Sequence, residues 1–213
     1  MKMLIMGAPG SGKGTQSEIL VRKLKIPAIS TGAMLRTAIA EGTDVGKEAE
    51  KYINDGNLVP DEIMISLVLD RISKSDCKDG YILDGFPRTL AQAKAMTEAG
   101  INIDFALMID VPDQDITDRI GGRRVCPKCG ATYHIKFKPS SKGEFCDQCG
   151  GKLEVRADDA PETVLSRLKT YHEITAPVIN YYKDMGKLVT VKAVNGVEET
   201  TVLVLEALGK QND

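Results

Sequence analysis

A glycine-rich loop followed by a lysine is the first segment of the chain with the residue types needed to bind an anionic ligand. Residues 7–15 read Gly-Ala-Pro-Gly-Ser-Gly-Lys-Gly-Thr and directly follow the apolar run 2–6. Glycines let backbone N–H groups surround an anion, the start of the next helix adds its dipole, and Lys13 can reach outer phosphates. The segment predicts a nucleotide-phosphate loop, with a glycine turn that binds nothing as the alternative. The hydroxyl of Thr15 comes one residue later than the one that coordinates magnesium in such loops, which argues against direct coordination.

A carboxylate and an arginine flank a turn after a second apolar run. Residues 81–88 read Tyr-Ile-Leu-Asp-Gly-Phe-Pro-Arg. In open parallel sheets, ligands bind at the carboxyl ends of the strands. There Asp84 can face a magnesium ion or its waters, and Arg88 can hold a phosphate with two N–H groups. Either residue alone would more simply be a strand-ending Asp or a surface Arg, but the phosphate loop favours the functional interpretation.

Four of the five cysteines have the spacing of a metal centre. Cys126 and Cys129 form one Cys-x-x-Cys pair, Cys146 and Cys149 form another, and sixteen residues separate the pairs. In a reducing compartment this spacing favours a structural zinc site with four thiolates and no open ligand position. Two disulfides or a redox-active pair are the alternatives, and iron could replace zinc. Cys77 stands alone and is expected to be a partly buried or solvated thiol.

Short apolar runs that alternate with helical patterns predict the sheet that must position these groups. The predicted strands are 2–6, 28–30, 81–83, 104–110 and 188–194. Strands separated by helices favour a parallel sheet with right-handed crossovers. Segment 30–59 is predicted to be a helical flap, and segment 122–159 is too short to hold a core without a metal.

The order and spacing of the motifs resemble those of the adenylate kinase family over essentially the whole chain. The matching segments are residues 7–15, Ser-Thr-Gly-x-Met-Leu-Arg at 30–36, Asp-Gly-Phe-Pro-Arg at 84–88, Gly-Arg-Arg at 122–124 and Arg-Ala-Asp-Asp at 156–159. The resemblance implies an α/β fold with a P-loop NTPase-like, five-stranded parallel sheet flanked by helices. It divides the chain into a core (1–29, 60–121 and 160–213), a helical insertion that binds the nucleoside monophosphate (30–59) and a zinc-holding β lid (122–159).

The resemblance also implies a reaction, the reversible magnesium-dependent conversion of ATP and AMP to two ADP, and a set of site residues. The implied ATP-binding residues are Gly10, Ser11, Gly12, Lys13, Gly14, Thr15, Arg119, Arg123, Thr132, Tyr133 and, through a backbone carbonyl, Glu198. The implied AMP-binding residues are Thr31, Arg36, Asn57, Leu58, Val59, Gly85, Phe86, Pro87, Arg88, Gln92, Arg156 and Arg167. The implied catalytic residues are Lys13, Asp84, Arg88, Arg119, Arg123, Arg156 and Arg167.

Several arginines and no general base are what this chemistry requires. Phosphoryl transfer between nucleotides brings negative charges together, so catalysis depends on positioning and charge neutralisation. The acceptor phosphate is already largely ionised at neutral pH, so His134 and His172 are expected to be solvated or structural. Asp158 and Asp159 lie where the lid rejoins the core, and they either pair with arginines or cap the helix that starts near Pro161.

Composition narrows the possible partners. The net charge is −2, and the chain has no Trp, four Phe and six Tyr, which argues against nucleic-acid or anionic-membrane binding. The N-terminal apolar run is too short for a signal-peptide core or a membrane span. The expected protein is a cytoplasmic monomer that binds small nucleotides. The alternatives are a kinase for UMP, CMP or GMP, a nucleic-acid-dependent ATPase, and a zinc ribbon that docks a partner.

Overall fold

A five-stranded parallel sheet forms the centre of the molecule, in a computed structural model that describes residues 1–194 and 196–209. Its strands are hydrogen-bonded in the order β2-β3-β1-β4-β7. The strands of this sheet are β1 (Lys2–Met6), β2 (Ala28–Ser30), β3 (Tyr81–Asp84), β4 (Phe105–Asp110) and β7 (Leu188–Lys192). The predicted fold class is confirmed, and the predicted last strand is shorter than expected because it ends at Lys192.

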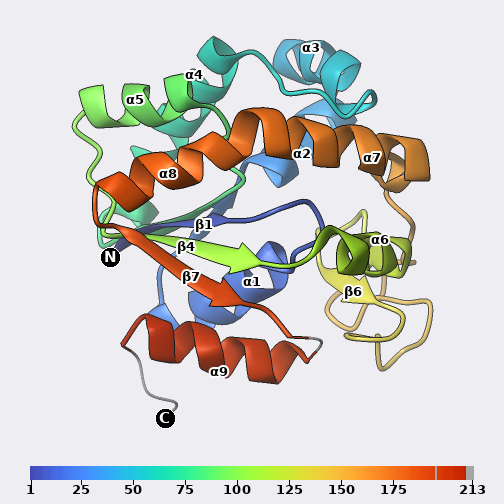
Figure 1. Ribbon diagram of the computed structural model, residues 1–213. Helices are drawn as coiled ribbons and strands as arrows, with labels where there is room; N and C mark the ends of the chain where they lie inside the picture. Colours follow the sequence, from blue (N-terminus) through green and yellow to red (C-terminus); the bar gives the residue numbers. More distant parts are fainter. Residues whose placement is uncertain (195, 210–213) are drawn as a thin grey trace.

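Helices cover both faces of the sheet. They are α1 (Lys13–Leu24), α2 (Thr31–Ala40), α3 (Asp44–Ile53), α4 (Asp61–Ile72), α5 (Leu90–Glu98), α6 (Asp113–Gly121), α7 (Pro161–Thr170), α8 (Ala176–Asp184) and α9 (Val197–Ala207), with the short helical segments η1 (Ser75–Cys77), η2 (Ala157–Asp159) and η3 (Tyr171–Thr175). In Figure 1, α1 and α9 lie below the sheet, and α8 lies above it with α4 and α5. The carboxyl ends of β4 and β7 point toward α6 and the lid.

Burial on both faces explains why the strands are apolar throughout. Leu4, Ile82 and Leu107 on three neighbouring strands are completely buried, as expected for a parallel sheet covered by helices. Cys77 joins the same core with 2% of its surface exposed, and burial raises the pKa of its thiol. The expectation of a partly buried or solvated thiol is therefore wrong, because Cys77 packs fully into the apolar core.

The helical insertion consists of α2 and α3, which pack closely against each other. Their approach requires a glycine, because a side chain at Gly46 would collide with the backbone of Ala38. Thr43 caps α3 by accepting a hydrogen bond from the N–H of Gly46. The helical character predicted for 30–59 is confirmed.

The lid is a small β structure with its own packing. It contains β5 (Arg123–Val125) and β6 (Thr132–His134), which pair antiparallel, and a further bridge joins Val125 to Glu154. Its buried residues form a cluster separate from the core of the sheet, made of Cys126, Ala131, Tyr133 and Cys146. The lid therefore has little apolar packing of its own.

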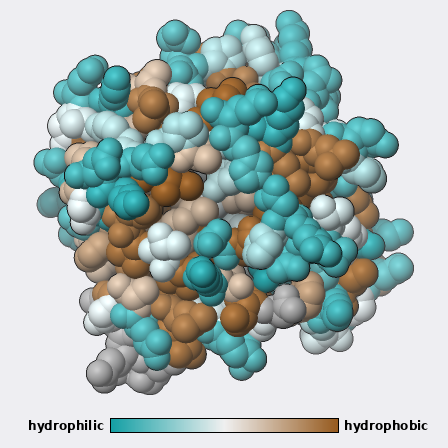
Figure 2. Space-filling view, viewed as in Figure 1, coloured by the Kyte–Doolittle hydropathy of each residue, from teal (hydrophilic) through white to brown (hydrophobic). Residues whose placement is uncertain are grey.

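The surface in Figure 2 is of mixed character. Hydrophilic side chains dominate the upper part of this face, and hydrophobic residues are interspersed with hydrophilic ones elsewhere. Within residues 1–194 and 196–209, no helix is both long enough and apolar enough to span a bilayer.

Candidate functional site

The phosphate loop, residues 7–15, connects β1 to α1 and lines a cavity of about 700 Å³. Gly12 precedes α1 with a left-handed φ of 96°, where a side chain would be strained. No side chain caps α1, and its first turn carries no acidic residue. The N–H groups at the start of α1 are therefore available to an anion in this large cavity. The predicted loop residues all line it: Gly10, Ser11, Gly12, Lys13, Gly14 and Thr15.

Lys13 carries a desolvated ammonium group in the loop. Its Nζ donates hydrogen bonds to the carbonyl oxygens of Gly7 and Ala8, each at 2.7 Å. Burial lowers the pKa of Lys13 to about 7; the charge of Asp84 opposes this shift, and nearby arginines add to it. A phosphate in the cavity would favour the charged form and raise this pKa again.

Asp84 ends β3 beside the phosphate loop. Its backbone is in register with Ile5 of β1, and its Oδ2 lies 4.0 Å from where a Cβ on Gly14 would be. Burial raises the pKa of Asp84, and the positive charge of Lys13 acts in the opposite direction. A partly buried carboxylate thus lies at the edge of the sheet where the sequence predicted it, close enough to the partly buried Lys13 for their charges to interact.

The six arginines predicted as site residues all line the same large cavity although they are far apart in the sequence, and Arg22 of α1 lines it as well. The predicted six are Arg36 on α2, Arg88 after β3, Arg119 on α6, Arg123 on β5, Arg156 before η2 and Arg167 on α7. Burial lowers the pKa of Arg36 and of Arg167 to about 10, so both stay charged at neutral pH. So many partly buried guanidinium groups in one cavity can neutralise several phosphates together.

Two adjacent carboxylates hold three of these arginines. Asp158 lies 2.6 Å from Arg156 and 3.0 Å from Arg167, and the fully buried carboxylate of Asp159 pairs with Arg123 and Arg167. Burial alone would raise the pKa of Asp158, but Arg156 and Arg167 together hold it below its usual range. No side chain caps α7. The arginine-pairing interpretation of these aspartates is confirmed, and the helix-cap interpretation is wrong.

A second, small cavity of about 70 Å³ shares four arginines with the large one. Ten of the twelve residues predicted to bind the monophosphate line it: Thr31, Arg36, Asn57, Leu58, Val59, Gly85, Arg88, Gln92, Arg156 and Arg167. The other two, Phe86 and Pro87, line the large cavity. Gly85 has a φ of 81°, and a side chain there would lie 2.9 Å from Arg88 and 3.0 Å from Thr31. This glycine therefore keeps space between two predicted ligand contacts.

The residues predicted to contact the adenine of ATP differ in their positions. Thr132 and Tyr133 line the large cavity, but the Tyr133 hydroxyl is turned into the lid, 3.3 Å from Cys146 Sγ and accepting the Asp147 N–H. The side chain of Tyr133 therefore offers no free hydroxyl to a base. Glu198 is exposed in the first turn of α9 and does not line the cavity, whereas its neighbours in α9 do.

Sequence reasoning missed several contacts around this end of the large cavity. Glu18 of α1 accepts hydrogen bonds from Thr132 at 2.9 Å and from Lys138 at 2.6 Å, which joins the lid to the core. Gln16 donates to the carbonyl of Val197, 181 positions away. No local pattern marks these residues, because each contact joins segments that only the fold brings together.

The two histidines have structural environments. His172 lies 2.8 Å from Asp113 at the surface. His134 is half-buried beside the large cavity, and its Nδ1 accepts the backbone N–H groups of Lys136 and Phe137. Burial lowers the pKa of His134, which favours the neutral ring. The expectation that the histidines are solvated or structural agrees with these contacts.

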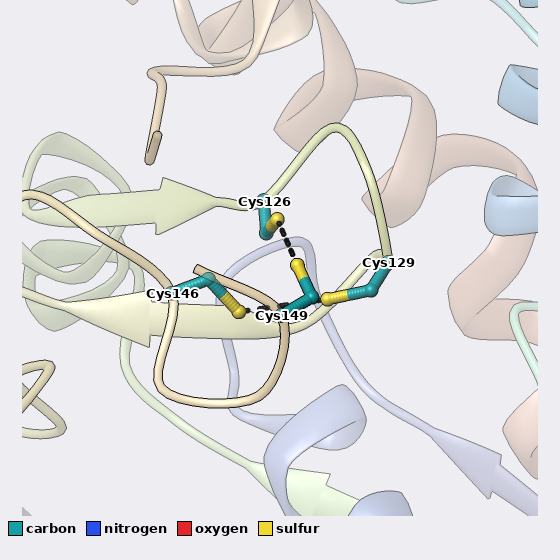
Figure 3. A group of neighbouring side chains, drawn as sticks. All are labelled: Cys126, Cys129, Cys146 and Cys149. Carbon is teal, nitrogen blue, oxygen red and sulfur yellow. Dashed lines mark hydrogen bonds between the residues drawn. The ribbon is translucent and has the colours of Figure 1, made fainter. Parts of the chain in front are cut away.

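The four lid cysteines converge on one point, as Figure 3 shows. Their sulfur atoms all lie within 4.8 Å of one another, and the shortest Sγ–Sγ distances are 3.4 Å (Cys126 to Cys149) and 3.5 Å (Cys129 to Cys146). The S–S bond of a disulfide is about 2.05 Å long. Thiolates that bind zinc tetrahedrally with Zn–S bonds of about 2.3 Å have their sulfur atoms roughly 3.8 Å from one another. The cluster therefore fits a tetrahedral four-thiolate metal site and not two disulfides.

Comparisons with known proteins agree with this geometry. The family model described as "Adenylate kinase" matches residues 5–187 of the chain. Among similar curated proteins are an "Adenylate kinase" of Caldicellulosiruptor bescii, 50% identical over 98% of this chain and 99% of that protein, and one of Ruminiclostridium cellulolyticum, 49% identical over 98% of this chain and 100% of that protein. A third, from Acetivibrio thermocellus, is 49% identical over 98% of each chain.

Proposed function

The chain belongs to the adenylate kinase family, and from this premise we propose that it catalyses the reversible reaction ATP + AMP ⇌ 2 ADP in the large cavity. One observation carries the proposal: the six predicted arginines and Lys13 line a single cavity together with the phosphate loop. Two nucleotides whose phosphates meet there carry several negative charges, and their neutralisation lowers the barrier to in-line transfer. The family membership makes the enzyme a phosphotransferase.

We assign ATP to the side of the large cavity formed by the phosphate loop and the lid. Gly10 to Thr15 would surround its phosphates with backbone N–H groups, and Lys13 would contact the outer ones. Arg119 and Arg123 would contact the transferred group from α6 and β5. Thr132 and the backbone around Tyr133 would lie near the base. Glu198 itself does not line the cavity, so a backbone carbonyl that contacts the base would come from one of the nearby residues that do.

We assign AMP to the small cavity beneath α2. Arg36 and Arg88 would hold its phosphate, Arg156 and Arg167 would bridge both nucleotides, and Gln92 would face the base. The remaining predicted contacts, Thr31, Asn57, Leu58, Val59, Gly85, Phe86 and Pro87, would surround the rest of the nucleotide. This arrangement directs the two phosphate chains toward the arginines that the cavities share.

Two metal ions fit the residues present. Magnesium prefers carboxylate oxygens and keeps several waters, and Asp84 offers a partly buried carboxylate next to the phosphate loop. When bound with ATP, magnesium would neutralise charge on its outer phosphates. We propose zinc for Cys126, Cys129, Cys146 and Cys149, because four thiolates leave no open position and the ion then has a structural role.

The three regions have separate tasks in this proposal. Residues 1–29, 60–121 and 160–213 form the core, 30–59 the AMP-binding insertion and 122–159 the lid. The lid would carry Arg123 and Arg156 over the nucleotides and exclude water, because hydrolysis competes with transfer. We propose a cytoplasmic monomer whose partners are ATP, ADP and AMP, without nucleic-acid or membrane partners. The net charge of −2 and the absence of Trp support this choice.

An acceptor assay tests the proposal. Purified protein is incubated with magnesium and ATP and with AMP, UMP, CMP or GMP, and the diphosphate products are measured. ADP formed fastest with AMP supports the proposal, and a faster reaction with another monophosphate would replace it with that kinase. ATP hydrolysis that DNA or RNA stimulates and AMP does not affect would instead indicate a nucleic-acid-dependent ATPase.

A further inference from the structure

A chain of hydrogen bonds at the starts of α4 and α5 ends at the small cavity. Asp61, the first residue of α4, accepts the Nε2–H of Gln92 at 2.7 Å with one carboxylate oxygen. Its other oxygen accepts the hydroxyl of Thr89 at 2.9 Å. Gln92 is 2% exposed and lines the small cavity. Asp61 itself does not line either cavity, so any effect on a ligand must act through Gln92.

The chemistry of the partners leaves the Gln92 amide only one orientation. A carboxylate only accepts hydrogen bonds, so the end of the amide that faces Asp61 must be the NH2 group. The other end must be the oxygen, because Oε1 accepts the backbone N–H of Arg88 at 2.7 Å. Two independent partners therefore prevent the 180° flip that a glutamine amide could otherwise make.

The fixed amide keeps one free N–H and one free lone pair. A 6-aminopurine offers the complementary pair: the ring N1 accepts and the 6-amino group donates. A 6-oxopurine has these roles reversed, since its N1–H donates and its 6-oxygen accepts. In a cavity where Arg36 and Arg88 anchor the phosphate, the base cannot slide to restore the match, and two like groups would face each other.

We propose that Asp61 is a positioning residue that determines the base preference of the acceptor site, by holding the Gln92 amide in the orientation that accepts a 6-aminopurine and refuses a 6-oxopurine. This proposal rests on the assignment of AMP to the small cavity. It differs from a purely structural role, in which Asp61 only ties α4 to α5 through Thr89, the residue that caps α5 by accepting the Gln92 N–H at 3.1 Å.

Asp61→Asn tests the proposal with AMP and IMP as acceptors, since the two differ only at position 6 of the purine and at N1–H. The replacement amide can present either its oxygen or its nitrogen, so of the two restraints on the Gln92 amide only the Arg88 N–H remains, and the flipped orientation becomes accessible. We expect the ratio of kcat/KM for AMP to that for IMP to fall at least about tenfold, mainly through a higher KM for AMP. Asp70→Asn is the matched control, because Asp70 lies on the same helix and forms an exposed pair with Lys74. A ratio that stays within twofold of the wild-type value, with both acceptors losing activity equally, would overturn the proposal.

A measurement on the wild-type protein covers the case in which Asp61→Asn does not fold. In NMR spectra of the Gln92 side-chain amide, one proton should show the downfield shift of a bond to Asp61 both with and without nucleotide. AMP should shift the second proton, and IMP at the same occupancy should not. Equal shifts with AMP and IMP, or no hydrogen-bonded amide proton, would overturn the proposal. If the wild-type protein forms no ADP from AMP, the proposed function fails, while the amide proton still decides whether Asp61 orients Gln92.

Discussion

The central sheet and the lid hold their functional side chains in different ways. In the sheet, Asp84 and the phosphate loop extend from strands whose residues, such as Leu4 and Leu107, are completely buried between helices. In the lid, two strands of three residues each carry Arg123 and Thr132, and the buried cluster consists of two cysteines, an alanine and a tyrosine. The first region is ordered by apolar packing, and the second relies on ion pairs and on four clustered cysteines that could hold a metal ion.

The difference shows how one chain can combine a rigid, packed sheet with a small module that is held by fewer apolar contacts. A packed parallel sheet unfolds only as a whole, whereas a small module attached by few contacts can open at low cost. Polar contacts join the lid to the core: Asp158 and Asp159 with Arg167 of α7, and Lys138 with Glu18. Such polar contacts can be exchanged for water without disturbing the apolar core of the sheet.

Arg88→Ala should have the largest effect, because it removes charge from the site without removing packing. We expect kcat to fall about 10²–10³-fold while the melting temperature changes by less than about 4 °C. Within the protein, Arg88 Nε donates only to the carbonyl of Gly85 in the contacts described. Steady-state kinetics and thermal melts check this, with Arg71→Ala as control because Arg71 pairs with the exposed Asp76. Equal losses of rate and stability would show that Arg88 is structural.

Cys146→Ser should disable the lid and leave the sheet folded. We expect the bound metal to fall from about one ion per chain to near zero, and kcat to fall at least about tenfold because lid arginines lose their positions. Elemental analysis and hydrogen exchange of residues 122–159 provide the measurements. Cys77→Ser is the matched control, because Cys77 lies in the core of the sheet and should leave the metal content unchanged.

A substitution in the core of the sheet is the counterpart of Cys146→Ser in the lid. Leu107→Ala should reduce the free energy of unfolding by about 2–5 kcal/mol without changing the metal content, because Leu107 is completely buried in β4. If Cys146→Ser destabilised the sheet as much as Leu107→Ala does, the two regions would not be independent and the comparison would fail.

Lys13 should link nucleotide binding to pH, because packing desolvates it. Its folded pKa of about 7 is below the ordinary value of 10.5, so the folded protein binds fewer protons than the unfolded chain between these values. Its contribution to stability therefore rises with pH across this window.

ATP should restore the proton on Lys13, with an uptake of about one proton per nucleotide at pH 8. Calorimetry in two buffers of different ionisation enthalpy measures it. Lys13→Met should abolish the uptake and the exposed Lys47→Met should not; identical uptake in both would contradict the assignment.

Glu18→Gln should have the smallest effect. It weakens the pair with Lys138, in which each side chain is about a third exposed, so we expect a loss of less than about 1 kcal/mol. The KM for ATP should rise about two- to threefold, since the closed lid is less favoured. Asp76→Asn breaks an exposed pair far from the lid and should leave this KM unchanged. An unchanged KM in Glu18→Gln would mean that this contact does not hold the lid.

Local patterns were sufficient to predict most of the fold. Strand 2–6, strand 28–30 and the helix after Pro60 are where the apolar periodicity placed them, because burial on both faces leaves a continuous apolar run in the sequence. Strand 188–194 was predicted too long, since the chain leaves the sheet after Lys192 to reach α9. An edge strand has one partner, so its apolar pattern does not mark its end.

The candidate site was predictable to the extent that its motifs are local. The phosphate loop, Asp84 with Arg88, and the two Cys-x-x-Cys pairs each lie within a few residues, so their spacing alone indicates their chemistry. The competing interpretations of Asp158 and Asp159 could not be separated in this way. Their partners Arg123 and Arg167 come from the lid and from α7, and sequence separation hides such contacts.

The sequence by itself indicated the fold class, the phosphate loop and the four cysteines that could hold a metal ion, because each depends on residue type at short spacing. Only the tertiary structure decided that six arginines share one cavity, that the Tyr133 hydroxyl is turned into the lid, and that Asp61 holds the Gln92 amide. The physical reason is that hydrogen bonds and ion pairs act over a few ångströms. Residues far apart in the chain come within that range only after the helices have packed on the sheet.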